Sequence, residues 1–119
     1  MGKIIIIGGN KLKGELVVDG SKNAVLPILA ATVLNGGINI IRNCPLLKDV
    51  EMMIEILKKI GCRVKMEGST IIIDSSTISS TEIPEDFATE MRSSIFLMGP
   101  MLARWKKVTI SYPGGCVCL

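Results

Sequence analysis

The stretch KNAVLPILAATVL, residues 22–34, is apolar from residue 24 onward except for Thr32. A helix with this sequence has no polar face, and helices that are hydrophobic all round are buried rather than laid on a protein surface. Pro27 has no backbone N–H, so we expect it near the first turn of the helix. The Asn-Gly-Gly that follows, residues 35–37, predicts the end of the helix. The fold therefore has to enclose this segment.

The segment 46–61 predicts the clearest helix of the chain. Its apolar residues recur at helical spacing, and Gly61 is a stop signal. Glu55 and Lys59 lie four residues apart, a spacing at which opposite charges pair on a helix surface.

Short β-prone segments surround these helices. Residues 4–9 and 14–20 predict a strand pair, and residues 38–43 a further strand. The segments 62–67 and 70–74 predict a hairpin that turns at Gly68-Ser69.

The last third of the chain predicts a helix over residues 87–105, kinked at Gly99-Pro100, and a strand over residues 107–112. The expected element order is ββαβαββαβ, which indicates an α/β protein. Because the helices are more apolar than the strands, we expect helices at the centre and sheet outside.

Composition excludes several classes of protein. The 119 residues, 48% of them hydrophobic, suit one modest domain, and a net charge of +3 is too small for a typical nucleic-acid-binding protein. Residues 1–65 hold ten basic against five acidic residues, which favours a compact anionic substrate. The sequence contains neither a membrane-spanning run nor a signal peptide, so we expect a cytoplasmic protein with no membrane partner.

The four cysteines differ in their surroundings. With no histidine and no C-x-x-C, they argue against a zinc site. Cys44 and Cys62 have apolar neighbours and are expected to be buried as small hydrophobic residues. Cys116 follows Pro113-Gly114-Gly115, where exposed backbone N–H groups could stabilise a thiolate; a plain turn at a strand end is the alternative. Cys118 has no comparable context.

Three polar residues are candidates for binding an anion. Lys22 and Asn23 stand at a strand-to-helix junction, where a helix N-terminus favours anions, although a solvated lysine would look the same. Arg92 leads into an apolar run and needs either an acidic partner, such as Glu85 or Glu90, or an anionic ligand. The chain has no GxGxxG or GxxxxGK[ST] motif and no acidic metal cluster, so no common nucleotide site, metal or cofactor is indicated.

Four blocks carry a resemblance to a known family: GNKLKGELVVDGSKNAVLPILAATVL (9–34), CPLLKDVEMMIEIL (44–57), TEIPEDFATEMRSSIFLMGPMLARW (81–105) and SYPGGC (111–116). In order and spacing they resemble the N-terminal portion of the bacterial UDP-N-acetylglucosamine 1-carboxyvinyltransferases, peptidoglycan enolpyruvyl transferases of the EPT/RTPC-like family. The resemblance covers nearly the whole chain. The related shikimate-pathway enzymes share the fold but lack the PGGC block.

The resemblance implies a reaction and its residues. The 3′-hydroxyl of UDP-N-acetylglucosamine attacks C2 of phosphoenolpyruvate, a loop cysteine protonates C3, and phosphate leaves from a tetrahedral intermediate. Cys116 matches that cysteine, which is also the target of fosfomycin. Lys22 and Asn23 match the pair that engages both substrates, and Arg92 matches an arginine that holds the anionic one.

The resemblance also implies a fold of two inside-out α/β barrels, each made of three repeated units with buried helices. Residues 1–21 would then be a strand pair that belongs to the other domain, and residues 22–119 part of the first domain. After Cys116 the chain has VCL where family members have Gly-Ala/Ser-Arg-Pro, and the remainder of the family fold is missing. We therefore expect a truncated part that is inactive alone; a non-catalytic sugar-nucleotide-binding module and a non-functional product of a broken gene are alternatives.

Overall fold

The structure is a computed structural model and describes residues 2–83, 85–86 and 92–110. Its main elements are α1 (Lys22–Ala31), β1 (Ile38–Ile41), α2 (Lys48–Ile60), β2 (Arg63–Glu67), β3 (Thr70–Asp74), the 3-10 helix η1 (Arg92–Leu97) and α4 (Met98–Trp105). An α/β fold is thus confirmed for the described residues.

The three strands form an antiparallel sheet in the order β1-β3-β2. Ile40 of β1 pairs with Ile72 of β3, which in turn pairs with Lys65 of β2. Because side chains alternate along a strand, Ile71 and Ile73 face the helices and are fully buried. The predicted hairpin between residues 62 and 74 is confirmed, and Gly68 in its turn has a φ of +60°.

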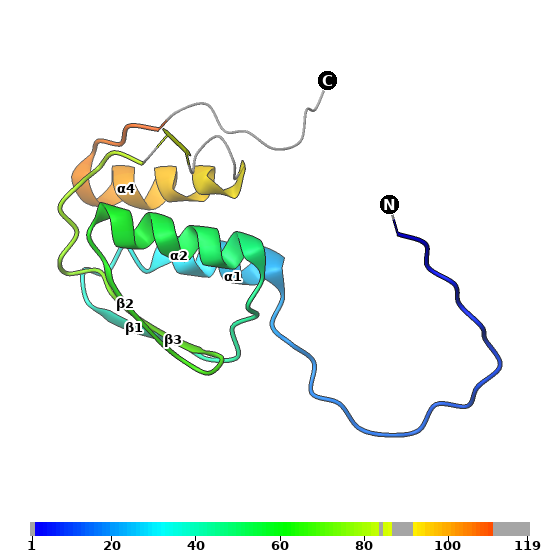
Figure 1. Cartoon of the computed structure of the whole chain (residues 1–119). Coiled ribbons are helices and arrows are strands. Elements are labelled where there is room, and N and C mark those ends of the chain that lie inside the picture. Colours follow the sequence, from blue (N-terminus) through cyan, green and yellow to red (C-terminus); the bar gives the residue numbers. More distant parts are fainter. Residues whose placement is uncertain (1, 84, 87–91, 111–119) are drawn as a thin grey trace.

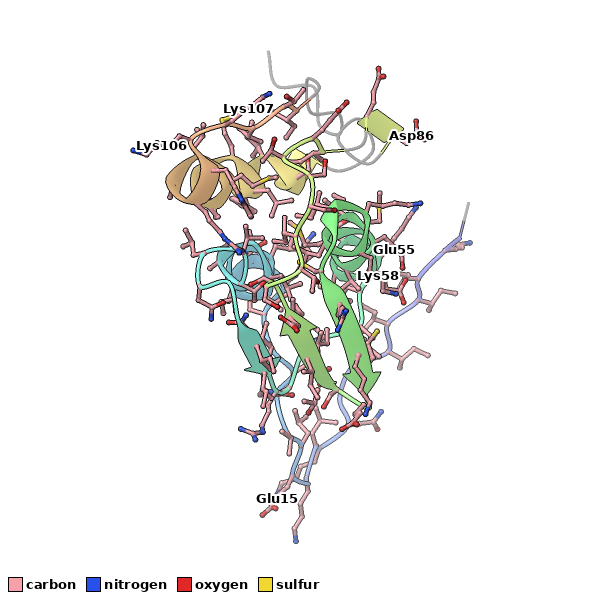
Figure 2. The ribbon with its side chains drawn as sticks, turned by 90° about the vertical axis from the view of Figure 1, so that its left-hand side faces the viewer. Glu15, Glu55, Lys58, Asp86, Lys106 and Lys107 are labelled. Carbon is pink, nitrogen blue, oxygen red and sulfur yellow. The ribbon has the colours of Figure 1, made fainter. Side chains whose placement is uncertain are left out.

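The helices lie in two layers over one face of this sheet. Figure 2 shows α1 and α2 next to the strands, with α4 on the side of the helices away from the sheet. The core lies between these layers, and helix α2 contributes the largest share of it. Its fully or almost fully buried side chains are Val50, Met53, Ile54, Ile56, Leu57 and Ile60. Each such side chain stabilises the fold by roughly 1.5–3 kcal/mol relative to full exposure.

Helix α2 follows the sequence pattern closely. It ends at Ile60, and Gly61 adopts the left-handed conformation with a φ of +116°. The predicted Glu55–Lys59 pair is wrong, because Glu55 instead pairs with Lys58 at 3.2 Å, one turn away at i,i+3. Figure 2 shows this ion pair on the outer side of α2.

Helix α1 departs from two expectations. It begins at Lys22, so Pro27 lies inside the helix rather than in its first turn. The helix is also only half buried: Val25, Leu26, Leu29 and Ala30 pack in the core, whereas Ile28 is 50% exposed. An exposed face tolerates the proline, because the carbonyl that loses its helical N–H partner can meet water.

The two ends of the described chain also differ from the prediction. Residues 2–20 form no helix or strand, and residues 2–19 are exposed, so the expected strand pair is not found (Figure 1). An isolated two-stranded hairpin is marginal without a surface to pack on. Of the expected last strand, residues 107–110 are described, and in them Thr109 forms a parallel bridge with Glu82. The expected helix over residues 87–105 is described only from residue 92, as a 3-10 turn that becomes α-helical at Met98.

Candidate functional site

Helices α1 and α2 begin at the same end of the molecule (Figure 1). An ion pair joins their first turns: Lys22 Nζ lies 3.0 Å from Asp49 Oδ2. Both side chains stay partly in water, Lys22 being 45% and Asp49 37% exposed. A cation that is held by one carboxylate and still open to solvent can also bind an anionic ligand.

The backbone at this end has free hydrogen-bonding capacity. The N-cap residues of α1 and α2 are Ser21 and Leu47, and neither side chain accepts a hydrogen bond from the N–H groups of the first turn. The Ser21 carbonyl accepts from the N–H groups of Ala24 and Val25, which closes the first turn of α1. The N–H groups at a helix start lack partners within the helix and carry the positive end of its dipole. Two helix starts therefore add to the positive charge of Lys22.

Asn23 is the second residue of α1, and its side chain is exposed. It makes no hydrogen bond to any of the residues that the structure describes. Its amide thus lies next to Lys22 with both its donor and its acceptor available.

A close backbone approach fixes the start of α1. A Cβ atom on Gly20 would lie 2.5 Å from the carbonyl oxygen of Asn43 and 3.1 Å from Cδ of Pro45. Only glycine fits here, so the chain leading into α1 rests directly on the loop leading into α2. The N–H of Cys44 donates to the Ser69 carbonyl at 2.9 Å, which anchors that loop to the hairpin turn.

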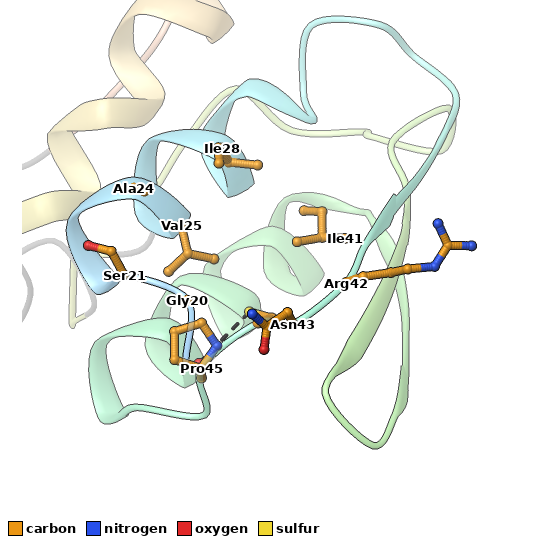
Figure 3. Close-up of a pocket in the computed structure, with 10 residues that line it drawn as sticks. Gly20, Ser21, Ala24, Val25, Ile28, Ile41, Arg42, Asn43 and Pro45 are labelled. Atoms are coloured by element: carbon orange, nitrogen blue, oxygen red, sulfur yellow. Dashed lines mark hydrogen bonds between the residues drawn. The ribbon is translucent and has the colours of Figure 1, made fainter. Parts of the chain in front are cut away.

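A mostly apolar, open pocket of about 190 Å³ lies beside this junction (Figure 3). Ala24, Val25 and Ile28 of α1 form one wall, and Ile41 and the loop after it form the other. The pocket shares Gly20 and Ser21 with the helix start, but Lys22 and Asn23 do not line it.

Arg92 is the first residue of η1, which packs against α1. In Figure 1, η1 begins at the same end as α1 and α2. The fold thus brings the backbone of Arg92 to the end of the molecule that carries Lys22 and Asn23.

Cys116 and the Pro-Gly-Gly before it lie outside the described residues, as does Cys118. The described chain ends at residue 110, after a segment that turns back from the C-terminal end of α4 (Figure 1). This segment is held by two backbone hydrogen bonds, from the Ile83 N–H to the Thr109 carbonyl and from the Thr109 N–H to the Thr81 carbonyl. The role of Cys116 stays a prediction.

Cys44 and Cys62 are buried free thiols, as expected from their neighbours. Burial raises the pKa of Cys44, and it raises the pKa of Cys62 from 9.0 to about 11 although Arg104 acts in the opposite direction. Both sulfurs are therefore protonated at neutral pH and unsuited to act as nucleophiles.

Sequence reasoning missed the partner of Lys22. Asp49 lies in a Lys-Asp pair at the start of a predicted helix, where an acidic residue is ordinary because it complements the helix dipole. The sequence carries no signal that joins residues 27 positions apart. Sequence reasoning also did not identify Arg104 as a candidate functional residue. Arg104 lies at the opposite end of the helices.

Comparisons with known proteins show the family of the chain. A sequence profile of EPSP synthase (3-phosphoshikimate 1-carboxyvinyltransferase) matches residues 6–118. The chain belongs to the EPSP synthase family. This finding confirms the resemblance to enolpyruvyl transferases that the sequence blocks carried.

Relatives that are named UDP-N-acetylglucosamine 1-carboxyvinyltransferase are similar to this chain over almost its whole length. UDP-N-acetylglucosamine 1-carboxyvinyltransferase 2 of Caldanaerobacter subterraneus is 56% identical over 116 residues, which are 98% of this chain and 28% of that protein. UDP-N-acetylglucosamine 1-carboxyvinyltransferase 1 of Symbiobacterium thermophilum is 50% identical over 119 residues, covering 96% of this chain and 27% of that protein. The chain thus spans little more than a quarter of the length of these relatives and matches their N-terminal part.

A solved structure shares the fold. The enolpyruvyl transferase NikO from Streptomyces tendae superposes with a TM-score of 0.71 at 26% identity, covering 82% of this chain and 23% of NikO. The described α/β arrangement is therefore that of an enolpyruvyl transferase segment.

Proposed function

We propose that the chain supplies part of the active site of an enolpyruvyl transferase that acts on phosphoenolpyruvate and UDP-N-acetylglucosamine in peptidoglycan synthesis. The observation that carries this proposal is the cluster at the helix starts, where Lys22, Asn23 and two free helix N-termini lie together. The names of the relatives specify the sugar nucleotide. The proposal keeps the cytoplasmic location expected from the sequence.

In the proposed reaction, the 3′-hydroxyl loses its proton to solvent and its oxygen forms a bond to C2 of phosphoenolpyruvate. The C2=C3 double bond breaks as the Cys116 thiol gives its proton to C3. The resulting tetrahedral intermediate loses phosphate and a proton, which leaves the enol ether. Lys22 and Arg92 hold the phosphate and carboxylate, and Asn23 bonds the sugar nucleotide. Fixed cations at the phosphate favour its departure because they already face the charge that develops there.

In this proposal, Asp49 positions the side chain of Lys22. By holding Lys22 at 3.0 Å, its carboxylate keeps the ammonium group at the helix starts before a substrate arrives. A bound phosphate would then find its cation already placed, which reduces the ordering cost of binding. Because the pair is exposed, we expect it to add little to the stability of the fold.

We further propose that the 119 residues are inactive by themselves, as one incomplete part of an inside-out barrel whose other units complete the site. Catalysis needs groups held around both substrates. Residues 2–19 would pack on that remaining part, which is why their apolar side chains are exposed among the residues described here. A binding module without catalysis is the second candidate, favoured by the accessibility of Lys22 and Asn23.

Calorimetric titration with each substrate tests the binding site. Lys22→Gln should weaken binding of phosphoenolpyruvate about tenfold, the size of one charge-assisted hydrogen bond. Lys58→Gln is a matched control, because Lys58 is also 45% exposed and also pairs with one carboxylate, but lies on the outer side of α2. If both variants bind as the parent chain does, or lose the same amount, the helix starts are not the site.

A phosphate-release assay tests the chemistry. With both substrates present, we expect no release from the 119-residue chain, and turnover would contradict the proposed inactivity. Binding of the sugar nucleotide without turnover would fit both the incomplete enzyme and the binding module. Covalent labelling of Cys116, but not of Cys44 or Cys62, by an epoxide analogue of phosphoenolpyruvate favours the enzyme segment over the module.

A further inference from the structure

The loop between α1 and β1 surrounds one side-chain amide with hydrogen-bond donors. The Oδ1 atom of Asn35 accepts from the Gly37 N–H at 2.9 Å, from Asn39 Nδ2 at 3.2 Å and from the Ser75 hydroxyl at 3.3 Å. Ser75 is fully buried, whereas Asn35 is exposed to water. The hydroxyl of Ser75 also lies 3.4 Å from the Gly37 carbonyl, so its proton is shared between two acceptors.

Gly36, the residue that follows Asn35, has a backbone N–H without a hydrogen-bond acceptor among the residues that the structure describes. The N–H of Gly36 makes no hydrogen bond to any residue in the described part of the chain, and Gly36 has no side chain to shield it. Its φ of +61° is in the left-handed region that favours glycine. Within residues 2–83, 85–86 and 92–110, the backbone nitrogen that follows Asn35 thus has no hydrogen-bond partner.

A cation lies against the same glycine. A Cβ atom built on Gly36 would lie 2.9 Å from Nη2 of Arg104 and 3.2 Å from its Cζ, so the guanidinium fills the place of a side chain. Arg104 is held there by hydrogen bonds from Nη1 to the carbonyls of Val33 and Ser75, each 2.9 Å long. A positive charge held against Gly36 favours loss of the proton from its N–H, because it stabilises the amide anion that forms.

From these contacts we propose that Asn35-Gly36 is a self-modifying site at which the fold promotes deamidation of Asn35. The glycine that carries the attacking nitrogen lies against a cation, and the side-chain oxygen of Asn35 that gains negative charge lies among three donors. This is the arrangement by which protein sites stabilise the anionic oxygen of a tetrahedral intermediate.

The steps balance with water as the only other reactant. Hydroxide removes the Gly36 amide proton, the nitrogen forms a bond to Cγ of Asn35, and the electron pair of the C=O bond moves to Oδ1. The intermediate collapses as the Cγ–Nδ2 bond breaks and Nδ2 leaves, protonated, as ammonia, which closes a five-membered succinimide. Water then opens either carbonyl of the ring, giving aspartate or isoaspartate.

The product would change the contacts of Arg104. A carboxylate at position 35 adds a negative charge in the loop on which the guanidinium rests. It also ends the donation from Asn35 Nδ2 to Asn39 Oδ1, now 2.7 Å long. The modification therefore acts where the end of α1 meets α4.

The test compares the folded chain with the same chain unfolded in urea, both at mildly alkaline pH. Peptide mapping by mass spectrometry follows the exchange of the amide for a carboxyl group at position 35, and isoaspartate marks the cyclic route. Because Asn-Gly also cyclises in an unstructured chain, the unfolded sample gives the intrinsic rate. We expect a faster rate in the folded chain; an equal or slower rate overturns the proposal.

Two variants identify the groups responsible. Ser75→Ala removes one donor to Oδ1 and Arg104→Lys replaces the guanidinium, and each should slow the folded-state rate about fivefold, the worth of one hydrogen bond. Arg63→Lys, an exposed change in β2, is the control and should leave the rate unaltered. Circular dichroism shows whether each variant folds, and the comparison of folded and unfolded parent chain needs no variant at all.

Discussion

The guanidinium of Arg104, near the C-terminal end of α4, donates to the carbonyl of Val33, which lies just after α1. Arg104 Nη1 donates to the Val33 oxygen at 2.9 Å and also to the Ser75 oxygen at 2.9 Å. The guanidinium lies 4.4 Å from the centre of the Trp105 ring. One side chain thus ties α4 to α1 and to the segment after β3.

Arg104→Lys should lower the free energy of unfolding by about 1–3 kcal/mol, because a single ammonium group cannot reproduce the planar arrangement that serves two carbonyls and an aromatic ring. Urea unfolding measures the effect. Arg63→Lys is the matched control and should change stability by less than about 0.5 kcal/mol. Equal effects at both positions would show that the carbonyl contacts of Arg104 do not stabilise the fold.

Substitution by alanine should destabilise the fold to different extents at two glycines with positive φ, Gly61 and Gly68. A Cβ on Gly61 would lie 2.7 Å from the Thr77 carbonyl oxygen and 2.8 Å from the Ser79 nitrogen, whereas a Cβ on Gly68 would meet nothing within 4 Å. Both substitutions pay the backbone strain of roughly 1–2 kcal/mol, but only Gly61→Ala adds a clash with backbone. The midpoint of urea unfolding should therefore fall clearly further for Gly61→Ala. Similar midpoints would mean that residues 77–79 can move away at little cost.

The thiol of Cys62 predicts a loss of stability at high pH. Burial raises its folded-state pKa from 9.0 to about 11, so the folded chain holds this proton more tightly than the unfolded chain. The contribution is fully present below pH 9 and is lost as the pH rises toward 11. To isolate the effect of this thiol from other effects of alkaline pH, the parent chain is compared with Cys62→Ala. The steeper decline should belong to the parent, and parallel curves would contradict the raised pKa.

The same burial predicts how the cysteines react. In the native chain at mildly alkaline pH, Cys44 and Cys62 should resist alkylation, and both should react after unfolding in urea. Peptide mapping after labelling with iodoacetamide distinguishes the sites. Rapid native labelling of either residue would show that its surroundings open far more easily than the packing implies.

Removal of residues 2–18 should leave the stability of the described core unchanged. Residues 2–19 are exposed throughout, and none belongs to the hydrophobic core. Thermal unfolding of the shortened chain should match that of the parent, while its solubility should rise because the exposed Ile4, Ile5, Ile6 and Ile7 are gone. Gly20 stays, since its contact with Asn43 sets the start of α1. A marked fall in the midpoint would mean that the segment packs on the core.

Patterns of adjacent residues predicted much of the fold. Helix α2 and the hairpin of β2 and β3 have strong local signals: regular apolar spacing, a glycine at each turn or end, and β-branched strands. Burial of Cys44 and Cys62 also followed from their neighbours. These features depend on residues close together in the chain, where backbone geometry leaves few alternatives.

Other expectations failed because they depended on partners elsewhere. The strands expected in residues 4–20 need a surface that the described residues do not offer, and helix α1 is only half covered, so its apolar sequence did not imply full burial. Glu55 pairs with Lys58 and not with Lys59 as predicted. Both lysines are within reach of Glu55 on the helix surface, so spacing alone did not decide between them.

The sequence by itself predicted helix α2, the hairpin of β2 and β3, the family and the candidate residues Lys22, Asn23, Arg92 and Cys116. Only the tertiary structure decided that Lys22 meets Asp49, that Gly20 rests on Asn43, and that Arg104 reaches Val33 and lies against Gly36. The physical reason is range: periodicity and turn preferences act over a few neighbouring residues, whereas these contacts join segments that come together only when the helices pack on the sheet.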